Sequence, residues 1–271
     1  MKVTASIVLY NTDVNDLLKS AASFLDSSID NKKLFLVDNS PSDQLKTVIS
    51  DKNVKYIYNP ANTGFGNGHN IAILQAIEWG SDYHFVINPD VSAKRDIISP
   101  MIDYMEIHTE IGMLMPKILN SDGTVQNLPK LLPSPYAILM RKAKFPKQVY
   151  QKFINQYELR LVAEDKVYET PILSGCFTLF RVKALKEIGL YDDRFFMYFE
   201  DWDISRRMNQ KYKTIYFPKV AIYHGYESGA NKNLRLFKIF VESAIRYFNK
   251  WGWVMDSDRN KVNRKTLRQF K

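Results

Sequence analysis

Two short acidic stretches, about 110 residues apart, carry the side chains best suited to chemistry. Residues 87–91 read Ile-Asn-Pro-Asp-Val and place Asp90 directly after an apolar run. The second stretch places Glu200, Asp201 and Asp203 within four residues, directly after an aromatic segment. Carboxylates are rarely buried unless they are paired or bind a metal. Acids attached to apolar segments therefore indicate a site in which one carboxylate holds a divalent cation and another accepts a proton.

Both stretches also have simpler interpretations. An Asn-Pro-Asp triplet is common in turns, because Pro fixes φ and because Asn and Asp bond to nearby backbone groups. Glu200, Asp201 and Asp203 could equally form the acidic first turn of a helix, followed by Arg206 and Arg207. The order of the two stretches, together with the elements around them, favours a site.

Charge is unevenly distributed along the 271 residues, whose formal net charge is +9. Residues 123–157 hold six basic and no acidic side chains, and residues 231–271 hold eleven basic and three acidic ones. On charge alone, such segments suit an anionic membrane or a nucleic acid equally well. A nucleic-acid-binding module is disfavoured, because the basic residues are not interleaved with a stacking platform or a reader motif.

Cysteine content and hydropathy indicate the compartment. The chain has one cysteine, Cys176, which excludes a disulfide framework and fits a reducing environment. Taken alone, Cys176 is most simply a small buried apolar residue. No apolar run reaches the roughly 18 residues that span a bilayer, and the N-terminal run is too short for a signal peptide. We therefore expect a cytoplasmic protein, with peripheral contact at the inner face of the plasma membrane as an option.

Apolar strands alternate with helical patterns in the first half of the chain. Strands are expected at 4–10, 34–37, 54–58 and 83–87, and helices at 13–25, 44–50 and 64–80. This alternation predicts an α/β fold with a mostly parallel sheet that helices cover on both faces. Ligands bind at the carboxyl ends of such strands, which here lie at 10–11, 38–39 and 88–90.

The alternation fails after residue 116. Residues 128–157 contain four prolines among lysines and apolar residues, which indicates a long excursion. Strands are expected again at 172–181, 214–217 and 220–224, with a helix at 182–188.

From about residue 4 to residue 224, this set of motifs resembles family 2 glycosyltransferases, and within them bacterial rhamnosyltransferase-like members. Asn88-Pro89-Asp90 resembles the Asp-x-Asp-like motif of the family, and Glu200-Asp201 its catalytic acid pair. The resemblance implies a GT-A-like fold and inverting transfer of a sugar from a nucleoside-diphosphate sugar. It suggests dTDP-L-rhamnose as donor, with a UDP-hexose or UDP-galactofuranose as the alternative. The implied acceptor is a cell-surface polysaccharide or a lipid-linked oligosaccharide.

The resemblance also implies roles for the acidic residues. Asp201 would be the general base that deprotonates the acceptor hydroxyl, and Glu200 would help to place the acceptor. Asp90 would hold Mn²⁺ or Mg²⁺ against the donor diphosphate, and His224 would add a metal or diphosphate contact. Asn88 replaces the first acid of the motif and leaves one carboxylate, so a strict metal requirement stays open.

Further residues are assigned by the same resemblance. The nucleotide-sugar side comprises strand ends and a glycine-rich segment: Tyr10, Asn11, Asp38, Asn62, Gly64, Phe65, Asn70 and Asn88. Three glycines in five residues of that segment allow the backbone to approach a ligand, although the pattern is not Gly-x-Gly-x-x-Gly. In isolation Asp38 would be a turn residue, and Phe65 and Asn70 could equally be packing and capping residues. The acceptor side comprises Gly175, Cys176 and Trp202.

We expect a catalytic domain at residues 1–230, with a nucleotide-binding half over about 1–122 and an acceptor half over about 123–230. Apolar residues recur at helical spacing after Leu234, so residues 231–271 are expected to form a basic amphipathic helical arm. This arm would pack on the domain or bind an anionic membrane. A nucleotidyltransferase is the rival enzyme class, but it should show a glycine-rich loop with a basic residue after the first strand, and residues 10–13 have neither.

Overall fold

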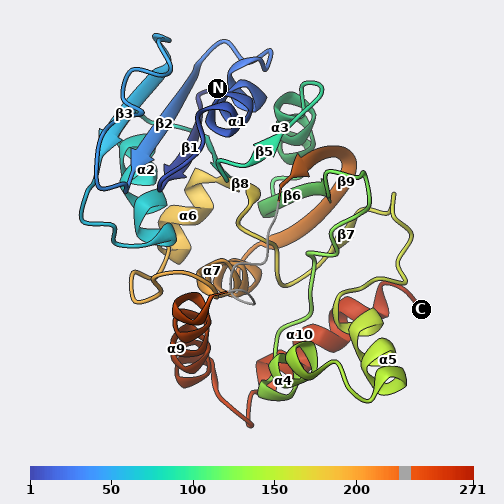
Figure 1. Cartoon of the computed structure of the whole chain (residues 1–271). Coiled ribbons are helices and arrows are strands. Elements are labelled where there is room, and N and C mark those ends of the chain that lie inside the picture. The colour runs from blue at the N-terminus through green and yellow to red at the C-terminus, as the bar shows by residue number, and fades with distance from the viewer. Residues whose placement is uncertain (226–232) are drawn as a thin grey trace.

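The computed structural model describes residues 1–225 and 233–271, so the predicted domain boundary at residue 230 lies outside the described residues (Figure 1). The strands are β1 (Val3–Leu9), β2 (Lys32–Asp38), β3 (Val54–Tyr58), β4 (Tyr83–Ile87), β5 (Val91–Ser92), β6 (Ile111–Leu119), β7 (Tyr168–Glu169), β8 (Phe177–Arg181) and β9 (Lys213–His224). The helices are α1 (Val14–Leu25), α2 (Phe65–Glu78), α3 (Ile98–Ile107), α4 (Pro135–Ala143), α5 (Lys147–Tyr157), α6 (Val182–Ile188), α7 (Glu200–Asn209), α9 (Leu234–Trp251) and α10 (Ser257–Arg268).

The strands form one sheet in the order β3-β2-β1-β4-β8-β6-β9-β5, and β7 pairs with β9. The first four strands in this order are parallel to their neighbours, as predicted. β8 is antiparallel to both β4 and β6, which makes the sheet mixed. Because β1, β2 and β4 run in one direction, their carboxyl ends meet at one edge of the sheet.

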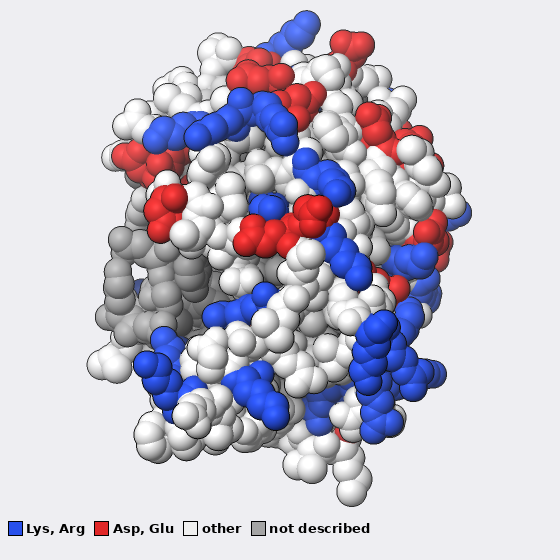
Figure 2. Space-filling view, turned by 90° about the vertical axis from the view of Figure 1, so that its right-hand side faces the viewer, with Lys and Arg blue, Asp and Glu red and all other residues white. Residues whose placement is uncertain are grey.

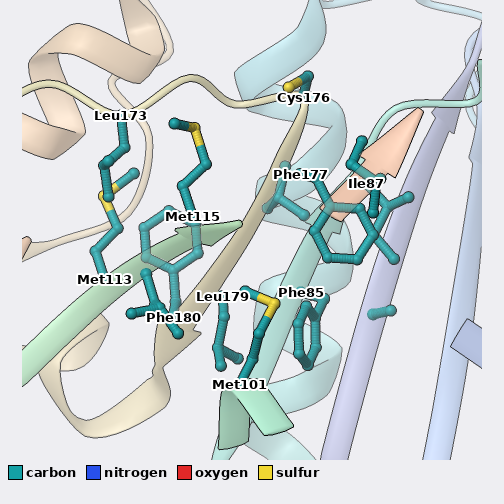
Figure 3. Close-up of a cluster of buried hydrophobic side chains, with 14 of the residues drawn as sticks. Phe85, Ile87, Met101, Met113, Met115, Leu173, Cys176, Phe177, Leu179 and Phe180 are labelled. Carbon is teal, nitrogen blue, oxygen red and sulfur yellow. The ribbon is translucent and has the colours of Figure 1, made fainter. Parts of the chain in front are cut away.

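Helices cover both faces of the sheet, as expected from the alternation in the sequence. α1 and α3 lie on one side, and α2, α6 and α7 lie on the other (Figure 1). On the first side, Phe24 of α1 packs against Phe85 of β4, with 6.1 Å between ring centroids. Figure 3 shows the same core, where Met101 of α3 lies close to Phe85 and Leu179. This rigid layer supports the strand ends that carry the site.

A buried network of polar side chains attaches α2 to the sheet. Ser6 Oγ lies 2.7 Å from His69 Nδ1 and 2.8 Å from His84 Nε2. His84 Nδ1 in turn lies 2.8 Å from Thr4 Oγ1. Burial lowers the pKa of both imidazoles, that of His84 to about 3, so both are neutral at pH 7. This network fixes the N-terminal end of α2 relative to β1. It thereby also fixes the glycine-rich segment.

The helix predicted at 44–50 is wrong, because residues 44–48 form turns. Leu45 is the one buried residue of that segment, so it lacks the packing that stabilises most helices. The strands predicted at 214–217 and 220–224 form the single strand β9. Its register against β6 shifts between Pro116 and Lys117, so the extra residues of β9 form a β-bulge.

The long excursion predicted at residues 128–157 contains two helices, α4 and α5. Pro135 is the first residue of α4, and the Ser134 side chain caps that helix by accepting a hydrogen bond from Ala137 N. Pro146 is the N-cap residue of α5. Proline at a helix start costs no hydrogen bond, so these prolines begin helices instead of breaking them.

The C-terminal helices pack against the rest of the molecule. α9 buries Tyr247 and Phe248 in a cluster with Phe195 and Phe199, the residues that precede α7. Leu234, which belongs to the predicted apolar face, is 87% exposed. The apolar face is therefore only partly buried, and the single basic arm expected from the sequence is not confirmed.

α10 is attached at several points, one of which is the hydrogen bond from Lys265 Nζ to Glu169 Oε1 at 2.7 Å. Asn263 exchanges two hydrogen bonds with the backbone of Leu132, at 2.8 and 3.0 Å. Asp256, the N-cap residue of α10, forms a buried ion pair with Arg206 of α7. Within the described residues, no helix is both long and apolar enough to cross a membrane.

Candidate active site

The loops after β1 and β2 are joined to each other at the carboxyl edge of the sheet. Asn39 N donates to Leu9 O at 2.9 Å, and Asn11 N donates to Ser40 Oγ at 2.9 Å. Asn11 has a φ of 48° and Asn62 a φ of 42°, in the left-handed region that Asn tolerates better than most residues. Two predicted donor-side residues therefore lie where the backbone turns sharply.

A first pocket, the strand-end pocket, opens at this edge. It is lined by four of the predicted donor-side residues: Tyr10, Asn62, Gly64 and Phe65. The first turns of α9 line its other wall with Asn233, Arg235, Leu236 and Ile239. Tyr10 is 51% exposed, so its ring can stack on a planar ligand. Asn11, Asp38, Asn70 and Asn88 do not line this pocket.

Asp38 and Asn70 already have protein partners. Asp38 is fully buried, and its carboxylate accepts hydrogen bonds from Tyr56 OH at 2.6 Å and from Ser40 N at 2.9 Å. Asn70 exchanges two hydrogen bonds with the backbone of Tyr191, at 2.8 and 3.0 Å. Contact of Asp38 or Asn70 with a nucleotide stays a prediction. In the structure, Asp38 shapes the strand-end turn and Asn70 holds α2 against the segment before α7.

Two glycines allow the glycine-rich segment to approach α7 and the residues before it. Gly64 has a φ of 101°, and a Cβ there would lie 2.2 Å from Phe196 O, so no other residue fits without a shift. Phe65 N donates to the same oxygen at 2.9 Å. Gly175 lies between Phe65 and Asp201, since a Cβ on it would be 3.2 Å from the first ring and 3.4 Å from Asp201 Cβ.

Asp90 and His224 lie together beyond the end of β4. Asp90 Oδ1 is 3.3 Å from His224 Nε2, and Asn88 Nδ2 is 3.2 Å from the same nitrogen. Gln126 holds the other side of the ring, with Oε1 3.2 Å from His224 Nδ1. Burial would raise the pKa of Asp90, but its bonds to His224 and Asn88 outweigh burial and lower the pKa. Asp90 is therefore an anion at neutral pH.

These residues offer a partial set of metal ligands. Among the described residues, no three His, Cys, Asp or Glu side chains gather in one place. Asn88 Oδ1 is buried and has no hydrogen-bond partner in the described part of the chain. The Asp90 carboxylate, His224 and this oxygen suit a divalent cation whose remaining ligands come from a diphosphate.

Glu200 and Asp201 are the first two residues of α7. Tyr198 and Phe199, directly before them, both have a φ of 68°, an arrangement that is strained for non-glycine residues and is typical of functional sites. Asp201 accepts hydrogen bonds from Gly175 N at 3.3 Å and from Trp202 N at 2.9 Å. The strained turn and these two donors fix the direction of the Asp201 carboxylate.

The two carboxyl groups have raised pKa values. Burial raises the pKa of Asp201 to about 6, against the opposing effects of the Gly175 N–H and of Lys130. Burial and the charge of Asp201 raise the pKa of Glu200 well above its usual range. Asp201, with a pKa of about 6, is mostly charged at pH 7, and its charge favours the protonated form of Glu200. An anionic Asp beside a neutral Glu can accept a proton while the Glu donates a hydrogen bond.

We call Glu200 and Asp201 the catalytic pair, and Asp90, His224 and Asn88 the metal-ligand cluster. A second pocket, the catalytic pocket, is lined by residues of both groups. It is lined by Ser174, Glu200, Asp201, Trp202 and His224, and on its other wall by Lys130, Arg141 and Lys142. His224 and Asp201 therefore face one space, although they come from β9 and α7. Of the predicted acceptor-side residues, Trp202 lines this pocket, whereas Gly175 and Cys176 do not.

Cys176 belongs to the core. Its side chain is 4% exposed, and burial raises the pKa of the thiol to about 12. Figure 3 shows it beside Phe177 at the start of β8, above the apolar cluster. Its carbonyl oxygen accepts a hydrogen bond from Asn88 N at 2.8 Å, so Cys176 helps to position the metal-ligand cluster through its backbone.

Asp203, the third acid of the cluster, has a structural role. It is fully buried, and its carboxylate contacts Arg207 Nε at 2.8 Å, Trp251 Nε1 at 2.8 Å and Lys250 Nζ at 2.7 Å. The interpretation as an acidic first turn is confirmed for all three acids, since Glu200, Asp201 and Asp203 lie in the first turn of α7. Glu200 and Asp201 also line the catalytic pocket.

The pocket residues that the sequence analysis missed include Lys130, Arg141 and Lys142 in the catalytic pocket, and Arg235 and Leu236 in the strand-end pocket. The lack of acids in residues 123–157 was a signal for the first three. The lack of acids did not show that these residues lie near Asp201, because that proximity depends on packing between distant segments.

Comparisons with known proteins agree with this geometry. An N-acetylglucosaminyl-diphospho-decaprenol L-rhamnosyltransferase of Mycobacterium tuberculosis is 28% identical over 204 residues, which cover 70% of this chain and 66% of that relative, just under two thirds. Rhamnosyltransferase WbbL of Escherichia coli K12 is 22% identical over 255 residues, covering 89% of this chain and 91% of the relative.

The fold has a solved counterpart. A mannosyltransferase of Pyrobaculum calidifontis, PcManGT, in complex with GDP-Man and Mn²⁺, superposes with a TM-score of 0.61 at 14% identity, covering 92% of this chain and 64% of that one. The described residues thus have the GT-A fold. The family model for glycosyl transferase family 2 matches residues 4–189, more than half of the chain. The chain belongs to glycosyl transferase family 2.

Proposed function

We propose that the protein is an inverting glycosyltransferase that transfers L-rhamnose from dTDP-rhamnose to a lipid-linked glycan. The catalytic pocket carries this proposal, because Asp201, a carboxylate of raised pKa, and His224, bonded to Asp90, line the same space. A base and a diphosphate-binding cluster that face each other fit sugar transfer. The names of the relatives from M. tuberculosis and E. coli support rhamnose as the sugar, and the former supports a lipid-linked acceptor.

In this proposal, the nucleoside lies in the strand-end pocket against Tyr10 and Phe65, and its diphosphate extends toward Asp90 and His224. Asp90, His224 and Asn88 would hold a divalent cation such as Mn²⁺, which, when bound, offsets charge on the departing diphosphate. The Mn²⁺ in the Pyrobaculum structure supports this choice of cation.

Asp201 accepts the proton of the acceptor hydroxyl while the hydroxyl oxygen bonds to the anomeric carbon. The bond from that carbon to the diphosphate oxygen breaks, and its electron pair leaves with the nucleoside diphosphate. Neutral Glu200 orients the acceptor by donating a hydrogen bond. Attack on the face opposite the leaving group inverts the anomeric centre.

We also propose peripheral contact with the inner face of the plasma membrane, where a lipid-linked acceptor would lie. Apolar side chains that are exposed near basic residues support this contact: Phe145 is 74% exposed, Val254 83% and Met255 94%. Phe145 lies between Lys144 and Lys147 in the sequence, a mixture of apolar and basic groups that suits an anionic interface.

Release of nucleoside diphosphate across a panel of nucleotide sugars, with and without Mn²⁺, tests the function. We expect dTDP-L-rhamnose to be consumed fastest and Mn²⁺ to increase the rate. Faster consumption of a UDP-hexose would change the donor and keep the enzyme class. No consumption of any nucleotide sugar, with or without acceptor lipids, would reject a glycosyltransferase.

Asp90→Ala is expected to lower transfer on the order of 10²-fold and to remove the response to Mn²⁺, because the cluster loses its carboxylate. Calorimetry should show weaker binding of the nucleoside diphosphate in the presence of Mn²⁺. Asp103→Ala, which removes an exposed acid of α3, is the matched control. If Asp90→Ala bound the nucleotide as tightly as this control, with and without EDTA, residues 88–90 would be only a turn.

A further inference from the structure

Lys130 carries a positive charge that is buried beside the catalytic pair. Figure 2 shows Lys and Arg side chains spread over the surface of one face, where water and salt screen their charges. Lys130, in contrast, is 5% exposed, and it lines the catalytic pocket together with Glu200 and Asp201. A charge that water screens only weakly acts strongly on its neighbours. Lys130 is therefore suited to change the charge state of these acids.

Hydrogen bonds hold the ammonium group of Lys130 in this position. Its Nζ donates to Leu128 O at 2.8 Å and to Asn127 O at 3.2 Å. Both acceptors are neutral carbonyl groups, and within the described residues no carboxylate forms a direct ion pair with Lys130. Burial lowers the pKa of Lys130 to about 8, so the group is still mostly charged at pH 7. The wall of the pocket thus holds a positive charge that no direct ion pair in this part of the chain neutralises.

Two carboxylates interact with this charge from a greater distance. Glu158 and Asp201 both favour the protonated form of Lys130. Glu158 already pairs with two arginines, since its carboxylate lies 3.3 Å from Arg141 Nε and 2.5 Å from Arg160 NH2. Asp201 instead accepts hydrogen bonds from backbone N–H groups. Burial raises the pKa of Asp201, and the charge of Lys130 opposes that rise.

One short segment, which runs from Thr170 to Gly175, contacts both Lys130 and Asp201. At its start, Thr170 Oγ1 donates to Lys130 O at 3.1 Å, and Lys130 N donates to Ile172 O at 3.3 Å. At its end, Gly175 N donates to Asp201 Oδ2 at 3.3 Å. The fold therefore fixes the position of Lys130 relative to Asp201 through the backbone as well as through side chains.

Further titratable groups interact with Asp201 or share its pocket: Glu200, Tyr191, Cys176, Arg141, Lys142 and His224. The first three supply no positive charge. Arg141 is paired with Glu158, and Lys142 is exposed to solvent, which screens its charge. His224 is bonded to Asp90. Lys130 combines burial with a charge that acts on Asp201, which these groups do not.

We propose that Lys130 is a positioning residue for sugar transfer, and that its buried ammonium group keeps Asp201 in the charged form that accepts the proton of the acceptor hydroxyl. This inference rests on the proposed role of Asp201 as base. Lys130 stays protonated over the pH range in which Asp201 gains its charge, because its pKa is about 8 and that of Asp201 about 6. Its effect on transfer is therefore largest below pH 7.

Titration of the Asp201 carboxyl group, followed by ¹³C NMR of labelled aspartate, tests this inference without turnover. The Asp201 signal is identified by its absence from the Asp201→Asn variant. Lys130→Gln keeps two N–H donors for the carbonyls of residues 127 and 128 but has no charge. We expect it to raise the titration midpoint of Asp201 by about one pH unit, at the low end of the effect of a nearby opposite charge. Lys152→Gln, the same change at an exposed position of α5, should leave the midpoint as in the wild type.

Two further variants separate the charge of Lys130 from its packing. Lys130→Arg keeps a positive charge and should keep the wild-type midpoint. Lys130→Met replaces the ammonium group by an apolar end and should shift the midpoint as Lys130→Gln does, so it can take the place of Lys130→Gln if that variant does not fold. The inference is overturned if the uncharged variants titrate as Lys152→Gln does, or if Lys130→Arg shifts the midpoint as far as they do.

The pH dependence of kcat/KM for sugar transfer provides a second measurement. For Lys130→Gln, kcat/KM should be about tenfold lower than for the wild type at pH 5 and nearly unchanged at pH 8.5, because Asp201 is charged in both proteins at the higher pH. Affinity for dTDP in the presence of Mn²⁺ should be unchanged. A loss of the same size at every pH would indicate a purely structural role for Lys130 and contradict the inference.

The two measurements distinguish this inference from the proposed function. An unshifted NMR midpoint overturns the effect of Lys130 on Asp201, whatever the enzyme transfers. A shifted midpoint with an unshifted pH dependence of kcat/KM would confirm that effect and reject Asp201 as the base.

Discussion

Asp201→Asn is expected to reduce sugar transfer by about 10³-fold, within the range that a positioned general base contributes. The amide keeps the shape of the side chain and can still accept a hydrogen bond from Gly175 N, which lies 3.3 Å from Asp201 Oδ2. It cannot accept the proton of the acceptor hydroxyl. Affinity for dTDP in the presence of Mn²⁺ should be unchanged, because the nucleotide lies at the strand-end pocket and at Asp90.

The pH dependence of sugar transfer by the wild type is an independent test of Asp201 as the base. Burial raises the pKa of Asp201 to about 6, and the group is active when deprotonated. The ratio kcat/KM, which reports groups of the free enzyme, should therefore fall about tenfold per pH unit below pH 6 and level off above about pH 7. The charge that Asp201 gains in this range favours the protonated form of Glu200, so the two groups titrate as a coupled pair.

Asp193→Asn is the matched control for this variant. Asp193 is an exposed acid eight positions before Asp201, and its replacement makes the same chemical change outside the pocket. Near wild-type transfer by Asp201→Asn, or a pH profile without the acidic limb, would end the assignment of Asp201 as base. Loss of dTDP affinity in Asp201→Asn would mean instead that the residue acts on the donor.

The sequence could predict the elements that depend on local patterns. The four strands of the first half are continuous apolar runs, so their parallel pairing and the position of Asp90 just past β4 followed from alternation alone. Glu200 and Asp201 could be recognised because an acidic pair after an aromatic segment is unusual. The ends of these elements could therefore be predicted without any knowledge of packing, whereas the roles of the residues at those ends stay predictions.

The sequence could not predict contacts between distant segments. Asp38 looked like a ligand-binding acid, but the pairing of β2 with β3 brings Tyr56 OH to its carboxylate. Arg141 reaches Trp202, which lies 61 positions later in the sequence, because α4 packs beside α9 and α7. The role of the C-terminal segment depended in the same way on long-range contacts, since spacing alone did not separate a packed helix from a membrane helix.

Asp256→Ala is expected to destabilise the protein by about 3–5 kcal/mol, because it leaves a buried charge without its partner. Arg206 NH1 and NH2 donate to the two oxygens of Asp256 at 2.8 and 2.7 Å. The two side chains are 4% and 3% exposed, and the guanidinium lies 4.2 Å from the centre of the Trp251 ring. The variant also loses the cap of α10, since Asp256 accepts a hydrogen bond from Arg259 N.

Urea unfolding at pH 7 measures this loss, with Asp258→Ala as the control, because Asp258 is an exposed acid in the first turn of the same helix. Adding Arg206→Met to Asp256→Ala should recover part of the loss, since it removes the unpaired charge and leaves an apolar chain against Trp251. This recovery separates the buried charge from the lost cap. Equal midpoints for Asp256→Ala and Asp258→Ala would mean that the Arg206–Asp256 pair adds little stability. Other contacts would then hold α10, such as those of Asn263 with Leu132 and of Lys265 with Glu169.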